Sequence, residues 1–289
     1  MTLTCLFGCT EKPANNDDPD SQYEIPEMKL IEYNGYIADT VDDACIDFSN
    51  TAHGYIGVSV YSDARIKVQV VHDEYVYNYD IINDGTVSYY PLQSGEGYYK
   101  VRIMKNLYDS KYAEVYSEGK SVSFDSEFEP FLRPSNYVMY DADSACVKKA
   151  REMAENSSSA NNYISRVYEW VVNNVRYDNK KAKNVQKGYL PYPDDTFSTG
   201  KGICFDYASL TAAMLRSQGV PCKLITGKVA PDDLNHAWNM FYTEETGWIT
   251  VKFEASGDSW NRLDLTFSAG GSSSEFIGDG TNYSDIYQY

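Results

Sequence analysis

Short runs in which apolar and polar residues alternate occupy the chain from Lys29 to about Phe128. Turn signals such as Asn83-Asp84-Gly85 separate these runs. A strand with one buried face shows this alternation, and closely spaced turns connect antiparallel neighbours. We therefore predict an antiparallel β-sandwich of immunoglobulin-like type over residues 26–128, which acts as a spacer or supports the part that follows. The runs lie at residues 55–60, 66–71, 75–79, 86–92, 97–103 and 120–124.

Beyond this region the spacing of apolar residues becomes helical. Residues 144–156 and 160–175 carry apolar side chains three and four positions apart, which predicts two amphipathic helices. The polar, proline-bearing segment 180–196 is expected to be a surface loop. Residues 129–289 are therefore expected to form a second, α+β domain.

A third helix and a hairpin complete the second domain. Apolar spacing resumes after Cys204 and stops at Gly219, which suits a helix that ends on a glycine cap. Residues 236–242 and 247–253 read as two strands joined by a short turn. These elements bring chemistry with them, because a cysteine opens the helix and a histidine opens the first strand.

Cys204 falls in or just before the first turn of its helix. Unpaired N–H groups and the positive end of the helix dipole favour a thiolate over a thiol at that place. The alternative is a small apolar residue packed under the start of a helix, since free cysteines are usually buried. Cys204 is therefore a candidate nucleophile that needs partners.

His236 and Asp264 supply such partners. A neutral imidazole beside a thiol can accept its proton and later return it to a leaving amine. A carboxylate can fix the tautomer of that imidazole by accepting a hydrogen bond from its second nitrogen. The alternatives are a hydrogen-bonded histidine at a strand end and an aspartate on the surface. Cys204, His236 and Asp264, in this order, are the parts of a catalytic triad.

The motifs around these residues resemble the transglutaminase-like superfamily, and its bacterial members in particular. The resemblance covers roughly residues 130–289 and is carried by the segments Tyr177-Asp178, 200–208, 215–221 and 236–239. It implies a papain-like fold in which the helix of Cys204 packs on a sheet that carries His236 and Asp264. It also implies acyl transfer from an amide, through a thioester, to an amine or to water.

Two features depart from the pattern of that family. Its acid usually follows the histidine more closely, but Lys252 stands where that aspartate could sit. We therefore assign Asp264 and keep Glu254 as the reserve candidate. No sharp motif fixes the oxyanion donor; the backbone N–H of Cys204 is the natural contributor, and Tyr177 is a candidate side chain.

The net charge and the cysteine spacing limit the classes of partner, metal and cofactor that we expect. The formal net charge of −17 argues against nucleic acid, whose phosphates need a basic face, and suits a protein or peptide substrate. The six cysteines lack the paired spacing of a zinc site, and no acidic loop has the spacing of a calcium site, so we expect no cofactor and no metal. A disulfide between Cys45 and Cys146 stays open, and Cys222 is expected in the core.

The N-terminal residues point to export. Leu6-Phe7-Gly8-Cys9 resembles the processing site of a bacterial lipoprotein, and the polar residues 10–23 read as a tether. Residues 1–8 are too short for a whole signal peptide, so we favour a truncated signal and a membrane anchor on Cys9. Residues 1–25 would thus be signal and tether on an extracytoplasmic, surface-bound protein.

The sequence as a whole predicts an exported cysteine protease, amidase or acyltransferase that acts on protein or peptide amides. Hydrolysis is favoured over transamidation, because no feature marks a site for an amine acceptor. One alternative is a cell-surface binding or adhesion module that keeps the fold without catalysis. Another is an amidase that acts on glycan-linked asparagine or on cell-wall peptide. The sequence leaves the native substrate and the oligomeric state open.

Overall fold

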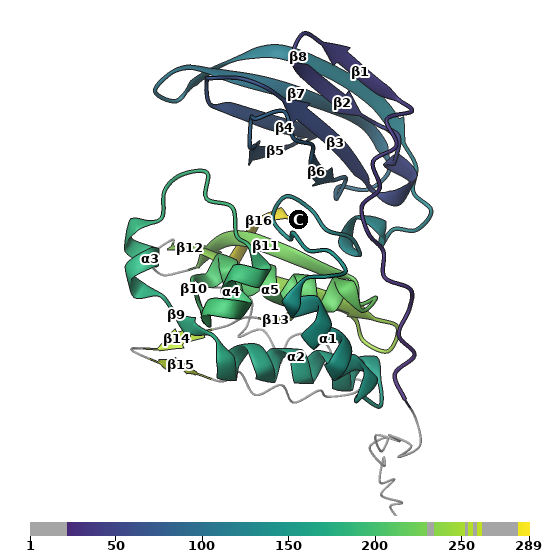
Figure 1. The fold of residues 1–289 in the computed structure, drawn as a ribbon, viewed down its shortest axis with the longest axis vertical. Helices are drawn as coiled ribbons and strands as arrows, with labels where there is room; N and C mark the ends of the chain where they lie inside the picture. The colour runs from purple at the N-terminus through teal and green to yellow at the C-terminus, as the bar shows by residue number, and fades with distance from the viewer. Residues whose placement is uncertain (1–21, 230–233, 252–253, 257–258, 262–282) are drawn as a thin grey trace, which may run out of the picture.

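The computed structural model describes residues 22–229, 234–251, 254–256, 259–261 and 283–289. Antiparallel sheets come first along the chain, and a mixed region of helices and one further large sheet follows (Figure 1). This order confirms the predicted α+β class. The division at residues 128 and 129, and the immunoglobulin-like type of the first part, stay predictions.

Two four-stranded antiparallel sheets make up the first part, which we call the N-terminal sheets. Their orders are β1-β2-β3-β6 and β5-β4-β7-β8. Inward side chains of both sheets, such as Val58 and Val101, are fully buried in one core. The strands are β1 (Ala38–Val41), β2 (Ala44–Asp47), β3 (Tyr55–Val60), β4 (Ile66–His72), β5 (Tyr75–Asp80), β6 (Ser88–Pro91), β7 (Gly97–Tyr108) and β8 (Lys111–Val122), with a 3-10 turn, η1 (Thr51–His53), between β2 and β3.

The alternating pattern predicted most of these strands, but the bounds that it gave for one of them were wrong. The run expected at 120–124 is the end of the long strand β8, which begins at Lys111. The first half of β8 is largely exposed at the edge of its sheet, so its side chains need not alternate. The edge strand β1 went unnoticed for the same reason, since three of its four residues are exposed.

In the described residues, five helices and a third four-stranded sheet follow the N-terminal sheets. The sheet has the order β13-β12-β11-β16, and the short strands β9 and β10 pair in parallel beside it. The helices are α1 (Ala145–Glu155), α2 (Ala160–Asn174), α3 (Asn179–Asn184), α4 (Pro193–Thr199) and α5 (Cys204–Ser217), preceded by a 3-10 turn, η2 (Glu129–Phe131). The strands are β9 (Arg176–Tyr177), β10 (Lys201–Gly202), β11 (Cys222–Val229), β12 (Leu234–Thr243), β13 (Gly247–Val251), β14 (Glu254–Ser256), β15 (Ser259–Asn261) and β16 (Tyr283–Gln288).

The segment expected to be a plain loop at 180–196 contains two short helices. Asp178 caps α3 by accepting a hydrogen bond from the N–H of Lys181 at 2.8 Å. Pro193 opens α4, where its missing N–H would have no partner in any case. Neither helix was predicted, because the segment is polar and each helix is too short to show a stripe of apolar residues. Only residues 185–192 between them lack helical structure.

Helix α5 lies at the centre of the second part, between the sheet and the other helices (Figure 1). Every residue from Asp206 to Ser217 is buried. A helix that is covered on all sides needs apolar residues all round, and Leu210 and Met214 are both fully buried. Its position is therefore fixed on every face, which holds its first residue, Cys204, in a defined place.

A carboxylate from a distant helix caps α1. Ser144 precedes α1, but its side chain makes no capping hydrogen bond. Asp194 of α4 instead accepts hydrogen bonds from the N–H groups of Ala145 and Cys146, at 2.8 and 2.9 Å. These donors would otherwise lack partners at the start of the helix. The first turn of α1 is therefore tied to α4.

Aromatic side chains join the N-terminal sheets to the second part. The ring of Tyr137 lies 5.4 Å from that of Tyr79, 4.8 Å from that of Tyr289 and 5.1 Å from that of Phe205. Such tilted pairs add about 0.5–1.5 kcal/mol each to the burial of the rings. Phe205 directly follows Cys204, so this cluster extends to the start of α5.

Candidate functional site

The turn before α5 places Cys204 at the first helical position. Ile203 is the extended residue before the helix, with φ −95° and ψ 175°. Asp206, at the third helical position, accepts a hydrogen bond from the N–H of Ile203 at 2.8 Å. A Cβ atom at Gly202 would lie 2.6 Å from the Cβ of Asp206, so this turn requires a glycine there. The spacing of Gly202, Cys204 and Asp206 is therefore a local geometric requirement.

The groups around the Cys204 thiol change its pKa in opposite directions. Burial raises the pKa of Cys204 above its ordinary value, and the Asp206 carboxylate raises it further, while backbone hydrogen bonds from Ala237 and Phe205 lower it. The net direction is upward. We predicted that the helix terminus would favour a thiolate, and these hydrogen bonds do so, but the cost of desolvating a charge outweighs them.

The strand that carries His236 reaches the same place. Ala237, the next residue, makes the backbone hydrogen bond to Cys204. His236 lies opposite Gly227 of β11, and its ring centroid is 6.1 Å from that of Trp238 on the same face of β12. In the described part of the sheet, β13 pairs with β12 only from Asn239 onward. The hydrogen bond of Ala237 thus brings β12, next to His236, to the first turn of α5.

Tyr177 lies near the nucleophile from the other side. It belongs to β9 and pairs in parallel with Gly202 of β10. Burial raises the pKa of the Tyr177 phenol, and the charges of Cys204 and Asp206 raise it further. The phenol therefore stays protonated and can donate a hydrogen bond close to Cys204, which suits the oxyanion role considered for it.

Three polar side chains that the sequence did not single out meet next to Cys204. Asp206 is fully buried, and its two oxygens accept from different partners. Lys181 of α3 lies with its Nζ 2.7 Å from Oδ2, and the Tyr189 hydroxyl donates to Oδ1 at 2.6 Å. The Nζ of Lys181 also donates to the Tyr189 hydroxyl at 2.5 Å. We call this group the Asp206 cluster.

Tyr189 belongs to residues 185–192, a segment that connects α3 to α4 and that we call the strap. Figure 1 shows it rising from α3 toward the N-terminal sheets. At Gly188 a Cβ atom would lie 2.9 Å from Nη2 of Arg65 and 3.0 Å from Cγ of Asp80. Arg65 and Asp80 form an ion pair at 2.7 Å on the N-terminal sheets. The strap therefore connects those sheets to the Asp206 cluster.

Other candidates cannot be placed beside Cys204. Asp264 lies outside the described residues, as do Lys252 and Cys9. Glu254 is in β14, where it pairs with Asn261 of β15. The triad of Cys204, His236 and Asp264 thus stays a prediction.

The other three cysteines in the described residues are free thiols. Cys45 and Cys146 are free, so the disulfide that the sequence left open is not present between them. Cys222 is fully buried, as expected of a core residue. Within the described segments, no group of three or more histidine, cysteine, aspartate or glutamate residues is gathered as a metal site would require. None of the described helices is both long and apolar enough to span a bilayer.

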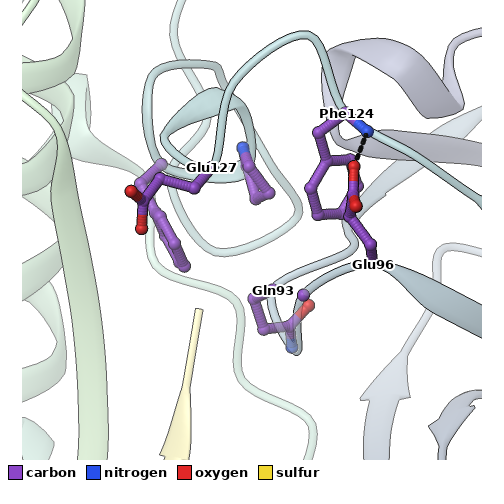
Figure 2. A pocket seen from close by; sticks show the side chains of 7 residues that line it. Gln93, Glu96, Phe124 and Glu127 are labelled. Atoms are coloured by element: carbon purple, nitrogen blue, oxygen red, sulfur yellow. Dashed lines mark hydrogen bonds between the residues drawn. The ribbon is translucent and has the colours of Figure 1, made fainter.

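A cavity of about 270 Å³ opens at the N-terminal sheets, apart from Cys204. Figure 2 shows Glu127 on one side of it, Glu96 and Phe124 on the other, and Gln93 below. Glu96 accepts a hydrogen bond from the N–H of Phe124 at 2.8 Å. The cavity shares no lining residue with the Asp206 cluster, so it is not part of the candidate site.

Two relatives match parts of this chain in sequence. A UPF0252 protein of Methanocaldococcus jannaschii is 37% identical over 62 residues, which are 20% of this chain and 18% of that protein. A UPF0252 protein of Archaeoglobus fulgidus is 30% identical over 118 residues, 35% of this chain and 37% of that protein. The chain thus spans well under half the length of either relative.

One solved structure is similar over a larger share of the chain. A candidate cysteine protease from Cytophaga hutchinsonii matches with 15% identity and a TM-score of 0.37, over 80% of each chain. The sequence model of the Transglutaminase-like superfamily matches residues 147–253, which include Cys204, the Asp206 cluster and His236. Residues 147–253 are therefore similar to a transglutaminase-like domain.

Proposed function

We propose that the protein is an exported thiol enzyme that acts on protein or peptide amides through Cys204. The observation that carries this proposal is the backbone hydrogen bond to Cys204 from Ala237, the residue of β12 that directly follows His236. A cysteine at the first position of a central helix and a histidine on the adjoining strand are the arrangement that thiol chemistry needs. The match to the transglutaminase-like superfamily supports the same chemistry.

The reaction follows from these groups. The sulfur of Cys204 attacks the carbonyl carbon of an amide while its proton passes to a ring nitrogen of His236. That proton then goes to the leaving nitrogen, the C–N bond breaks, and a thioester remains. The backbone N–H of Cys204 and the phenol of Tyr177 are the proposed donors to the oxyanion. Asp264 is proposed to orient His236.

The raised pKa of Cys204 affects how the attack begins. A thiol that resists ionisation at rest gives up its proton as the substrate is attacked, so His236 acts as a general base. Water then cleaves the thioester, which releases the acid and frees the thiol. We favour hydrolysis over transfer to an amine, because no described residue marks a site for an amine acceptor.

Location is part of the proposal. The segment Leu6-Phe7-Gly8-Cys9 supports export and a lipid anchor on Cys9, followed by a polar tether. An anchored enzyme of this kind meets protein or peptide substrates outside the cytoplasm. Globomycin treatment of producing cells, which blocks removal of lipoprotein signals, would then increase the mass of the protein; an unchanged mass removes the anchor from the proposal.

Alkylation of Cys204 tests the catalytic proposal. The purified protein is treated with iodoacetamide over a range of pH, and each cysteine is followed by mass spectrometry. We expect Cys204 to react near neutral pH about tenfold faster than in His236→Ala, because the variant lacks the base. The exposed His53 provides the matched control, since His53→Ala removes an imidazole far from the site.

Cys45, a half-exposed thiol whose pKa is raised by burial and by the charge of Asp47, is the internal reference for a thiol that is not activated. Equal rates in the wild type and His236→Ala, both no faster than that of Cys45, would overturn the proposal. They would support the second candidate function, a surface binding module that keeps the fold without catalysis. The raised pKa of Cys204 is the observation that favours this second candidate. Ammonia release from glutamine peptides, abolished in Cys204→Ala, then decides between a reactive thiol and an enzyme.

A further inference from the structure

A buried carboxylate lies two residues after the proposed nucleophile. Asp206 is fully buried, and its charge opposes the ionisation of Cys204. A carboxylate without a partner would be costly at such a place and would repel a developing thiolate. A thiol enzyme with this residue therefore needs something to cancel that charge.

Lys181 is placed to do so. Its Nζ lies 2.7 Å from Oδ2 of Asp206, the same oxygen that accepts from the N–H of Ile203. The ammonium also lies 4.4 Å from the centroid of the Tyr189 ring, which orients it from the side of the strap. At these distances the carboxylate and the ammonium form a close pair, with the Tyr189 hydroxyl bonded to both.

The cluster is built by segments that are far apart in the sequence. Asp178 caps α3 and so fixes the helix that carries Lys181. The strap brings Tyr189, and α5 brings Asp206. A lysine that served only as a solvated surface charge would not be held by three separate elements.

Other titratable groups lie near Cys204, and they too affect how readily its thiol ionises. Tyr177 of β9 interacts with Cys204, and His236 directly precedes the residue of β12 that is bonded to it. From α4, the charge of Asp195 acts on Tyr189. Lys201 of β10 is exposed, so solvent screens it. Within this set Lys181 is the cation in contact with Asp206.

We propose that Lys181 is a positioning residue for Cys204, whose ammonium cancels the Asp206 charge so that the neighbouring sulfur can become anionic during attack. Tyr189 completes the arrangement by holding both charges and by linking them to the strap. This inference rests on the proposed role of Cys204 as the nucleophile, but it concerns the charge next to the sulfur and can be measured without a substrate.

The experiment follows the alkylation of Cys204 against pH in four variants. Lys181→Met leaves the carboxylate alone, and we expect the midpoint of the alkylation profile to rise by about one pH unit, with about tenfold slower labelling near neutral pH. Lys181→Arg keeps a cation and should stay near the wild type. Asp206→Asn leaves the lysine alone and should move the midpoint downward. The double variant Lys181→Met/Asp206→Asn removes both charges and should return it toward the wild type.

A purely structural role would give a different result. Loss of packing or of the helix cap would slow labelling in both single variants and most of all in the double variant, without shifts of opposite sign. A midpoint in Lys181→Met equal to that of the wild type, in a folded protein, overturns the proposal. If Lys181→Met does not fold, a downward shift in Asp206→Asn still supports the proposal, and an unchanged midpoint there overturns it.

Failure of the proposed function has its own signature. In that case Cys204 of the wild type reacts like Cys45, and His236→Ala changes nothing. The proposal about Lys181 is judged instead by the alkylation midpoints of Cys204 in Lys181→Met and Asp206→Asn, each compared with the midpoint of Cys204 in the wild type. The two proposals can therefore fail separately.

Discussion

The N-terminal sheets and the region around α5 bury different kinds of side chain. The core of the sheets is made of apolar residues from alternating strands, such as Val58 and Val101. Around α5, three strongly polar side chains are fully buried: Asp206, Arg216 and Asn239. Each of them binds a segment that is distant in the sequence, such as the Ala208 carbonyl, to which Asn239 donates at 2.9 Å.

This difference has a physical meaning. A hydrophobic pattern alone is sufficient to place strands in a sheet, because burial is not directional. Buried polar groups are costly unless their partners are in position, so they fix the arrangement of segments more strictly. The N-terminal sheets also bury a few polar residues, such as Asp47 and Gln93, but the fully buried Asp206, Arg216 and Asn239 lie in the region with the proposed chemistry.

The largest effect that we expect is a loss of folding stability at alkaline pH. It should involve both regions, because each buries tyrosine side chains. Tyr79 and Tyr90 of the N-terminal sheets, and Tyr163 and Tyr168 of α2, have pKa values raised well above 10 by burial. A raised pKa gives stability that is present below pH 10 and is lost as the pH rises further, because only the unfolded chain ionises. Each of these tyrosines should remove about 1.4 kcal/mol of stability per pH unit above 10.

The measurement is the urea midpoint against pH, together with the absorbance of tyrosinate. We expect the midpoint to fall steeply above pH 10 and the absorbance to rise with unfolding. Tyr79→Phe and Tyr163→Phe, one variant in each region, should each make the fall less steep. Titration of these tyrosines in the folded protein, with an unchanged midpoint, would contradict the expectation.

The next effect concerns Arg216 and tests the role of buried polar groups directly. The guanidinium of Arg216 donates to the carbonyl oxygens of Cys222, Arg133 and Tyr289 at 2.8, 2.9 and 2.8 Å. Arg216→Met would remove all three of these hydrogen bonds from the interior, at a cost of about 3–5 kcal/mol in the free energy of unfolding. Urea unfolding measures this loss.

The matched control is Arg151→Met on α1. The side chain of Arg151 is 59% exposed and forms an ion pair with Glu155 at 3.2 Å. Solvent screens such a pair, so its loss should change the free energy of unfolding by less than about 0.5 kcal/mol. If the two variants lost equal stability, the contrast between buried and exposed polar groups would not hold here.

The smallest expected effect concerns the strap, which lies against Arg65 and Asp80 of the N-terminal sheets and carries Tyr189 of the Asp206 cluster. Gly188 has φ +85°, and an added Cβ would press on the pair of Arg65 and Asp80. Gly85, in a turn of the N-terminal sheets, has φ +90° but open space around its Cβ position. Both Gly→Ala variants should lose about 1 kcal/mol through backbone strain.

Only Gly188→Ala should also reach the site. By displacing the strap it should slow the alkylation of Cys204 about twofold to threefold near neutral pH, while Gly85→Ala leaves the rate unchanged. These factors correspond to less than about 1 kcal/mol at the site. Equal alkylation rates in both variants would mean that the N-terminal sheets do not influence Cys204 through the strap.

Sequence and structure agree where the physical signal is local. The helices predicted at 144–156 and 160–175 are present within a residue or two, and α5 begins at Cys204, because apolar spacing and glycine caps are readable in one segment. The matched transglutaminase-like domain was likewise visible in the motifs around Cys204 and His236.

The Asp206 cluster could not be predicted from the sequence, because it depends on contacts between distant segments. Its three residues come from α3, the strap and α5, and nothing in their spacing says that they meet. The one local signal was the acidic residue at the third position of α5, which is typical of a helix cap and not of a charge pair. Burial also reversed the expected effect of the helix terminus on Cys204, and burial depends on the whole fold.

The capping of α1 by Asp194 has a consequence for the order of events during folding. The cap joins residues 48 and 49 positions apart, so it forms only after a long loop has closed, at a considerable cost in chain entropy. Helices with local caps can begin to form early, on the time scale of their own residues. We therefore expect the first turn of α1 to become stable late, together with the docking of α4, and its backbone amides to gain their protection from hydrogen exchange at that step.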